Sequence, residues 1–175
     1  MSISEILIQR GVSVSKILDS TPTAADWKRV ETQLFPWSKV KLPLDYKKVV
    51  SEIGTRTLGN GFILLNPVCQ DPELALSVSN LQKLFAQYAL RLNVAAVHPC
   101  DGGIIAIAKT KGNTRLVLVP TDLNYSSWKT GVVDLNHNKI EVYPKFRQFL
   151  TDLFSNSATK LGPLAMQLAK RSGFS

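Results

Sequence analysis

The sequence predicts an α+β fold, with an antiparallel sheet of about five strands flanked by helices. Its first half carries apolar residues at the spacing of amphipathic helices. From residue 94 onward, runs of aliphatic and β-branched residues are separated by short polar breaks, which are typical of hairpins. Helices kept apart from a run of antiparallel strands define the α+β class.

The N-terminal 20 residues do not favour a single structure. They contain apolar side chains, but also Gly11 and two β-branched valines. A short helix and an adaptable arm both fit this pattern.

The first clear helix begins after Thr23. Asp26 follows three residues later, as in a capping box, where the hydroxyl and the carboxylate accept hydrogen bonds from free backbone amides. The residues that then share one apolar face are Trp27, Val30 and Leu34. Pro36 ends the helix, because proline lacks the amide that a continuing helix needs.

The stretch LPLDYKKVV, residues 42–50, predicts a second helix over about residues 44–53. Pro43 suits the start, since its fixed φ is helical and its missing N–H is not needed there. Asp45 lies at the positive end of the helix dipole, and Gly54 stands where a left-handed cap would end the helix. The inward stripe consists of Tyr46, Val49, Val50 and Ile53.

A glycine-rich turn and a strand over residues 61–66 come next, and Pro67 stops the strand. Pro72 is expected to start a third helix that runs to about residue 92. The long apolar stripe that indicates this helix is Leu74, Val78, Leu81, Phe85, Tyr88 and Leu92.

Four strands in an antiparallel meander are predicted for the second half, at residues 102–110, 114–121, 129–136 and 139–144. Residues 145–156 predict a closing helix with one apolar face. The remaining tail is weakly amphipathic and is interrupted at Gly162-Pro163, so it either docks on the domain or frays.

Composition indicates one globular domain. The 175 residues are 45% hydrophobic and 19% charged, which suits a buried core rather than disorder. Two cysteines, Cys69 and Cys100, suit a reducing compartment. The sequence shows neither a membrane-length apolar run nor a secretory leader, so a soluble cytoplasmic protein is expected.

The net charge of +8 is high for this length, but the basic residues are dispersed. One interpretation is an acidic partner, which would be nucleic acid, an anionic membrane or an acidic protein. The other is a solvated basic surface without a specific role. The absence of a Lys/Arg run favours the second interpretation over nucleic-acid binding.

No catalytic motif is found, and neither an enzyme nor a cofactor is expected. The Gly59–Gly61 segment precedes a strand, which is the wrong order for a dinucleotide site. The one cluster of potential ligands is His98, Cys100 and Asp101. A metal site would need a second pair, and His137 and Cys69 lie in separate segments, so a metal is not expected.

Basic and aromatic residues do occur together around the predicted hairpins. They are Lys109, Lys111, Arg115, Tyr125, Trp128 and Lys129. This group is a candidate surface for binding protein or single-stranded nucleic acid. Alternatively, the tryptophan covers the edge of the core.

The order of motifs resembles the SUKH superfamily. The motifs are AADWKRVE (24–31), LPLDYKKVV (42–50), Gly54 and GFILLNP (61–67), followed by GGIIAIAKTKGNTRLVLV, SSWKTGVVDL and YPKFRQFLTDLF. The resemblance covers about residues 17–156, which leaves 1–16 and 157–175 as extensions. Each motif is weak alone, whereas their order and spacing are fairly specific.

The resemblance implies an α+β sheet flanked by helices that serves as a protein-binding platform. Bacterial members are immunity proteins of polymorphic toxin systems, so it implies neutralisation of a cognate toxin without chemistry. The alternative is an intracellular scaffold or regulator, as the family's yeast member implies. Matching positions, which we assign to helix caps, packing and the turn, are Trp27, Glu31, Leu42, Pro43, Asp45, Tyr46 and Gly54.

Charge is where this chain departs from the family. Many such immunity proteins are acidic, whereas this chain carries +8. Charge complementarity therefore predicts a toxin with an acidic or mixed-charge surface. The seven matching positions do not identify that toxin, because binding surfaces should vary with the partner.

Overall fold

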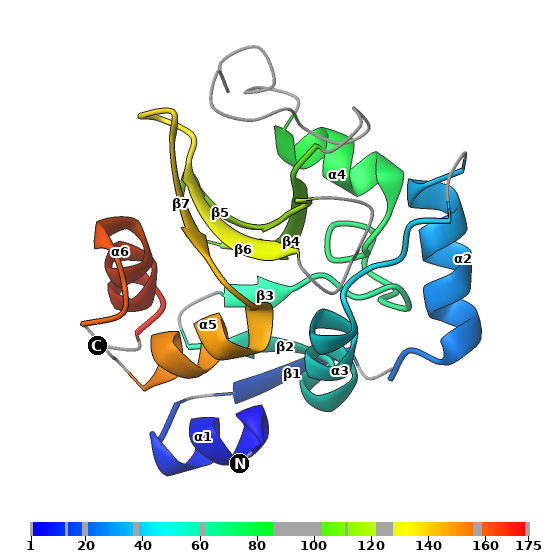
Figure 1. Ribbon diagram of the computed structural model, residues 1–175. Helices are drawn as coiled ribbons and strands as arrows, with labels where there is room; N and C mark the ends of the chain where they lie inside the picture. The colour runs from blue at the N-terminus through cyan, green and yellow to red at the C-terminus, as the bar shows by residue number, and fades with distance from the viewer. Residues whose placement is uncertain are drawn as a thin grey trace.

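A single antiparallel sheet runs through the computed structural model, with its seven strands in sequence order from β1 to β7 (Figure 1). The structure describes residues 2–12, 14–18, 21–36, 39–59, 62–85, 103–110, 112–121, 128–155 and 159–173. The strands are β1 (Val14–Leu18), β2 (Thr55–Leu58), β3 (Phe62–Leu64), β4 (Ile105–Lys109), β5 (Thr114–Val119), β6 (Lys129–Asp134) and β7 (Lys139–Tyr143). Each pairs with the next in antiparallel register.

Six helices flank this sheet within the described residues. They are α1 (Ile3–Gln9), α2 (Ala24–Leu34), α3 (Leu44–Ile53), α4 (Val78–Phe85), α5 (Phe146–Phe154) and α6 (Pro163–Arg171). The predicted α+β class is confirmed, with seven strands rather than about five. The two additional strands are β1, from the ambiguous N-terminal segment, and β2, which we predicted as part of a turn.

Both predicted extensions pack on the same core as residues 17–156. The boundary at residue 16 falls within β1, which pairs with β2. The apolar side chains that the two ends bury in the common core include Ile3, Ile6, Leu7, Ala165, Leu168 and Ala169. The Ser4 amide also donates to Glu52 Oε1 of α3 at 2.9 Å, which ties α1 to that helix.

Local signals placed α2 and α3 correctly. Asp26 Oδ2 accepts from the Thr23 amide at 2.9 Å and Thr23 Oγ1 accepts from the Asp26 amide at 3.3 Å, which completes the capping box. α3 spans Leu44–Ile53 as predicted. Gly54 follows it with a φ of 70°, a left-handed value that favours glycine. Its amide donates to the Val50 carbonyl at 2.8 Å.

The predicted helix start at Pro72 is wrong, because α4 begins only at Val78. Side chains hold the preceding residues in turns: Asp71 Oδ1 accepts from the Glu73 amide at 2.9 Å, and Asn80 Nδ2 donates to the Ala75 carbonyl at 2.8 Å. These contacts compete with helix formation. The predicted continuation from residue 86 to residue 92 lies outside the described residues.

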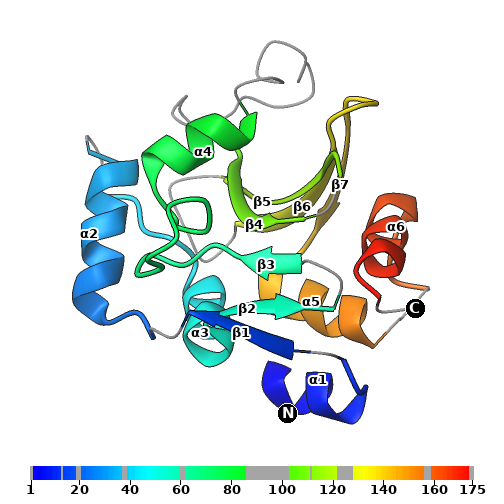
Figure 2. The ribbon, with the colours of Figure 1, turned by 180° about the vertical axis from the view of Figure 1, so that it is seen from behind.

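The two C-terminal helices, α5 and α6, form a layer against the β6–β7 part of the sheet. Tyr143 of β7 packs on Phe149 of α5 with ring centroids 4.8 Å apart, and α6 covers the same face of β7. α6 shows that the tail docks rather than frays. Figures 1 and 2 place α6 and α2 at opposite ends of the molecule.

Candidate partner-binding surface

Four of the seven matching positions, Trp27, Glu31, Leu42 and Tyr46, lie in one cluster at α2 and the start of α3. The Trp27 and Tyr46 rings meet edge to face with centroids 5.9 Å apart. Glu31 accepts a hydrogen bond from the Leu42 amide at 2.8 Å and forms an ion pair with Lys47. The Lys47 ammonium also lies 5.9 Å from the centre of the Trp27 ring, a cation–π arrangement.

Tyr46 connects this cluster to the sheet and to α5. Its hydroxyl donates to the Leu65 carbonyl at 3.0 Å, and its ring lies 5.3 Å from that of Phe146. Full burial raises the pKa of Tyr46, so the hydroxyl stays protonated and able to donate. Asp45 Oδ2 accepts from the Arg147 amide in the first turn of α5 at 3.3 Å. These residues therefore serve the architecture of the domain.

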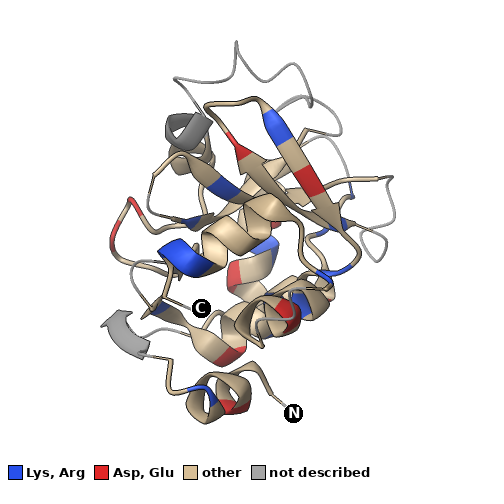
Figure 3. Ribbon diagram, turned by 90° about the vertical axis from the view of Figure 1, so that its left-hand side faces the viewer, with Lys and Arg blue, Asp and Glu red and all other residues tan. Residues whose placement is uncertain are grey.

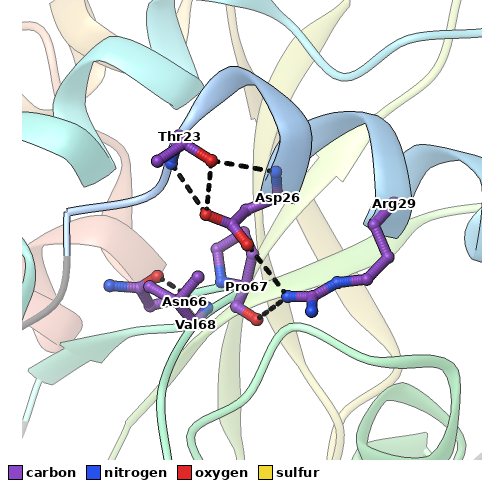
Figure 4. Close-up of polar contacts among 6 residues, drawn as sticks. All are labelled: Thr23, Asp26, Arg29, Asn66, Pro67 and Val68. Atoms are coloured by element: carbon purple, nitrogen blue, oxygen red, sulfur yellow. Dashed lines mark hydrogen bonds and ion pairs between the residues drawn. The ribbon is translucent and has the colours of Figure 1, made fainter.

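The Asn-Pro end of the following strand joins the same framework (Figure 4). The Arg29 guanidinium donates to Asp26 Oδ1 at 3.2 Å and to the Pro67 carbonyl at 3.4 Å. Asn66 Oδ1 accepts from the Val68 amide at 3.1 Å. The first turn of α2 is thus linked to the turn after β3, although the two are far apart in the sequence.

The predicted basic and aromatic surface is divided by the structure. Trp128 is only 4% exposed and packs edge to face on Phe35, with centroids 6.0 Å apart, so its ring lies in the core. Lys111 and Tyr125 lie outside the described residues. The remaining members are at two places on the sheet. Lys129 pairs with Val119, which is four positions along β5 from Arg115, roughly 13 Å at about 3.3 Å per residue.

Lys109 and Arg115 lie beside the β4–β5 hairpin. Lys109 forms an ion pair with the exposed Glu73. The Arg115 guanidinium donates to the carbonyls of Gly112 and Thr114, at 2.7 and 2.9 Å. From the opposite face, Arg171 of α6 donates to Thr114 Oγ1 at 3.4 Å. The sequence did not predict this contact of Arg171. A basic residue in the last turn of a C-terminal helix does not indicate that it will bind a hairpin far away in the sequence.

Lys129 belongs to a second group, at the outer end of the sheet. Val142 of β7 is directly opposite Gly131 of β6 and is 46% exposed. Ile140 lies two residues before Val142 on the same face of β7, and Lys129 of β6 is the diagonal neighbour of Val142. We call Lys129, Ile140 and Val142, together with Lys139 on the opposite face of β7, the β7 edge surface. Figure 3 shows the side of the molecule that carries β7 and α6.

The carboxylates of this region point inward or are engaged in turns. Glu141 accepts from the amides of Leu164 and Ala165 in the first turn of α6, at 2.9 and 3.1 Å. The Tyr143 hydroxyl donates to Glu141 at 2.7 Å and accepts from the Gly162 amide at 2.9 Å. Partial burial and the Glu141 carboxylate raise the pKa of Tyr143 to about 12, although the Gly162 amide opposes them.

Asp134 is engaged in the hairpin between β6 and β7. Its Oδ1 accepts from the Asn136 amide at 2.9 Å, and its Oδ2 lies 2.7 Å from His137 Nδ1. Desolvation raises the pKa of Asp134, but the hydrogen bonds from His137 and the backbone outweigh it, so the pKa is lowered.

Candidate metal ligands do not gather in the described part of the chain, where no group of three or more His, Cys, Asp or Glu residues could hold a metal ion. Residues 98–101 lie outside that part. His137 binds Asp134 as above, and Cys69 is a half-buried free cysteine. None of the helices in the described ranges has the length and apolar character needed to cross a membrane.

Comparison with known protein families, curated proteins and solved structures returns no match to this chain.

Proposed function

We propose that the chain is a protein-binding immunity protein of the SUKH type, which neutralises a cognate toxin by binding it. The observation that carries the proposal is the arrangement of the pattern residues. Trp27 packs on Tyr46, and Glu31 binds both the Leu42 amide and the Lys47 ammonium. Tyr46 in turn donates to the Leu65 carbonyl. Motifs spread over more than 40 positions of the sequence thus share one buried framework, as expected if they define a fold family.

Because the pattern residues form a buried framework, we expect exposed residues to recognise the partner. The net charge of +8 supports a toxin with an acidic or mixed-charge surface. At the β7 edge surface, the exposed Val142 has the exposed Lys129 as its diagonal neighbour, and the exposed Lys139 begins the same strand on its other face. An apolar centre with polar surroundings is the usual composition of a protein interface.

Co-expression with the toxin encoded next to the gene of this chain tests the proposal. We expect growth to be rescued by the chain and not by an unrelated basic protein of similar size. Failure of rescue together with failure of complex formation would contradict the proposal. Recovery of several housekeeping proteins, with no toxin gene nearby, would favour a scaffold of the same fold. Retention of RNA or DNA at low salt, lost steeply as salt rises, would favour nucleic-acid binding.

A further inference from the structure

We propose that the partner binds at the open edge of the sheet, where it aligns an extended segment with acidic and apolar residues along β7. The inference rests on the proposed function, because it names the site at which that function's partner binds. It follows from the position of β7, the exposure of Val142 and the charges around both.

β7 is an edge strand. Within the described part of the chain, β6 is the strand with which β7 pairs, along the whole length Lys139–Tyr143. No strand of the described ranges pairs with the other side of β7, so its backbone amides and carbonyls there can bind a further strand. Edges of this kind are templates for strand addition, in which main-chain hydrogen bonds supply affinity and alternate side chains supply specificity.

The exposed side chains of β7 suit such a partner. Val142 is 46% exposed, whereas valines of the neighbouring strands β5 and β6, such as Val117 and Val133, are fully buried. Gly131, directly opposite Val142, has no side chain to cover it, and a Cβ there would lie 2.9 Å from Val117 Cγ2. Val142 therefore remains available for apolar contact beside Ile140.

The charges select an acidic partner. Lys129, Lys139 and Lys145 are exposed around the edge. The two carboxylates on β6 and β7 are already engaged, Asp134 with the hairpin and Glu141 with the first turn of α6. The edge thus offers positive charge without competing exposed carboxylates of its own strands, which favours acidic segments and accelerates their association.

A second copy of this chain fits the edge less well. Pairing two β7 strands would bring the lysines of both edges together, and like charges in juxtaposition are unfavourable. Self-association is therefore an outcome that the test must report, and a stable dimer that buries β7 would contradict the proposal.

The test compares Val142→Glu with Lys28→Glu in calorimetric titrations against the neighbouring-gene toxin domain. Val142→Glu replaces the apolar contact with a repelling charge, and we expect binding to weaken by about tenfold or more. Lys28 is exposed on α2, far from β7, so Lys28→Glu should leave binding within about twofold of the original chain. Lys129→Glu provides a second variant at the edge should Val142→Glu fold poorly.

Amide exchange measured on the same complex reports the contact itself. We expect residues 139–143 to exchange more slowly when the toxin domain is bound. Unchanged binding by folded Val142→Glu and Lys129→Glu, with protection elsewhere, would overturn the β7 site and leave the proposed function intact. Absence of any complex with the original chain would overturn both.

Discussion

Glu141 occupies the space into which a side chain at Gly162 would project. A Cβ on Gly162 would lie 2.6 Å from both Cδ and Oε1 of Glu141, closer than real Cβ contacts allow. The φ of Gly162 is −76°, which any residue adopts, so the requirement for glycine is spatial. The glycine lets a carboxylate from the sheet bind the first turn of the C-terminal helix.

Gly162→Ala should therefore displace Glu141 and destabilise the fold by about 1–2 kcal/mol, the cost of a lost helix cap. Urea unfolding measures the change. The matched control is the same substitution in a Glu141→Ala background, where the obstructing carboxylate is gone and the added methyl should cost almost nothing. Equal costs in the two backgrounds would show that the two residues are not coupled.

Removal of the Glu31 carboxylate should be costly, because it leaves both the Lys47 ammonium and the Leu42 amide without this acceptor. We expect Glu31→Ala to lower the free energy of unfolding by about 2–4 kcal/mol. Glu31→Gln should cost less, since an amide oxygen can still accept from Leu42. The control is Glu73→Gln, which breaks the exposed pair with Lys109 and should cost about 0.5 kcal/mol or less. Similar costs at Glu31 and Glu73 would contradict the buried role of Glu31.

Tyr46→Phe tests the link between α3 and the sheet. The substitution keeps the ring contacts with Trp27 and Phe146 but removes the donor to the buried Leu65 carbonyl. We expect a loss of about 1–2 kcal/mol in urea unfolding at neutral pH. A stability equal to that of the original chain would mean that the carbonyl finds another donor.

Acid should reduce the contribution of Asp134 to the free energy of unfolding. Its folded-state pKa is lowered from 3.8, so the folded chain binds fewer protons there than the unfolded chain. The stabilisation is fully present above the pKa of Asp134 in the unfolded chain. It is lost as the pH falls through the pKa of Asp134 in the folded chain. The stability difference between the original chain and Asp134→Asn should therefore be largest above about pH 5 and shrink toward pH 2. A stability difference that stays constant between these two pH values would contradict this role of Asp134.

Local signals in the sequence were sufficient to predict the elements whose ends are set by contacts between residues close in the sequence. The capping box of Thr23 and Asp26, and Pro43 with Gly54, placed α2 and α3 almost to the residue. The hairpins of the meander were equally evident, because strand period and polar breaks are local properties. α4 was misplaced where the Asn80 side chain binds the backbone of earlier residues.

Contacts between residues far apart in the sequence could not be predicted from a single sequence. β1 becomes a strand through pairing with β2, more than 35 positions away, and its own pattern was ambiguous. Trp128 is covered by Phe35, a contact that no spacing rule predicts. Glu141 binding to α6, and Arg171 reaching Thr114, likewise depend on how the tail docks. The candidate surface was therefore predicted by residue type, while the grouping of those residues required the tertiary structure.

Direct titration of the purified chain with the purified toxin domain encoded beside its gene decides whether binding is the function. A saturable complex of defined stoichiometry, with the toxin's activity abolished in the same mixture, is the result we predict. A chain that is folded by circular dichroism and leaves the toxin unbound and fully active would contradict it.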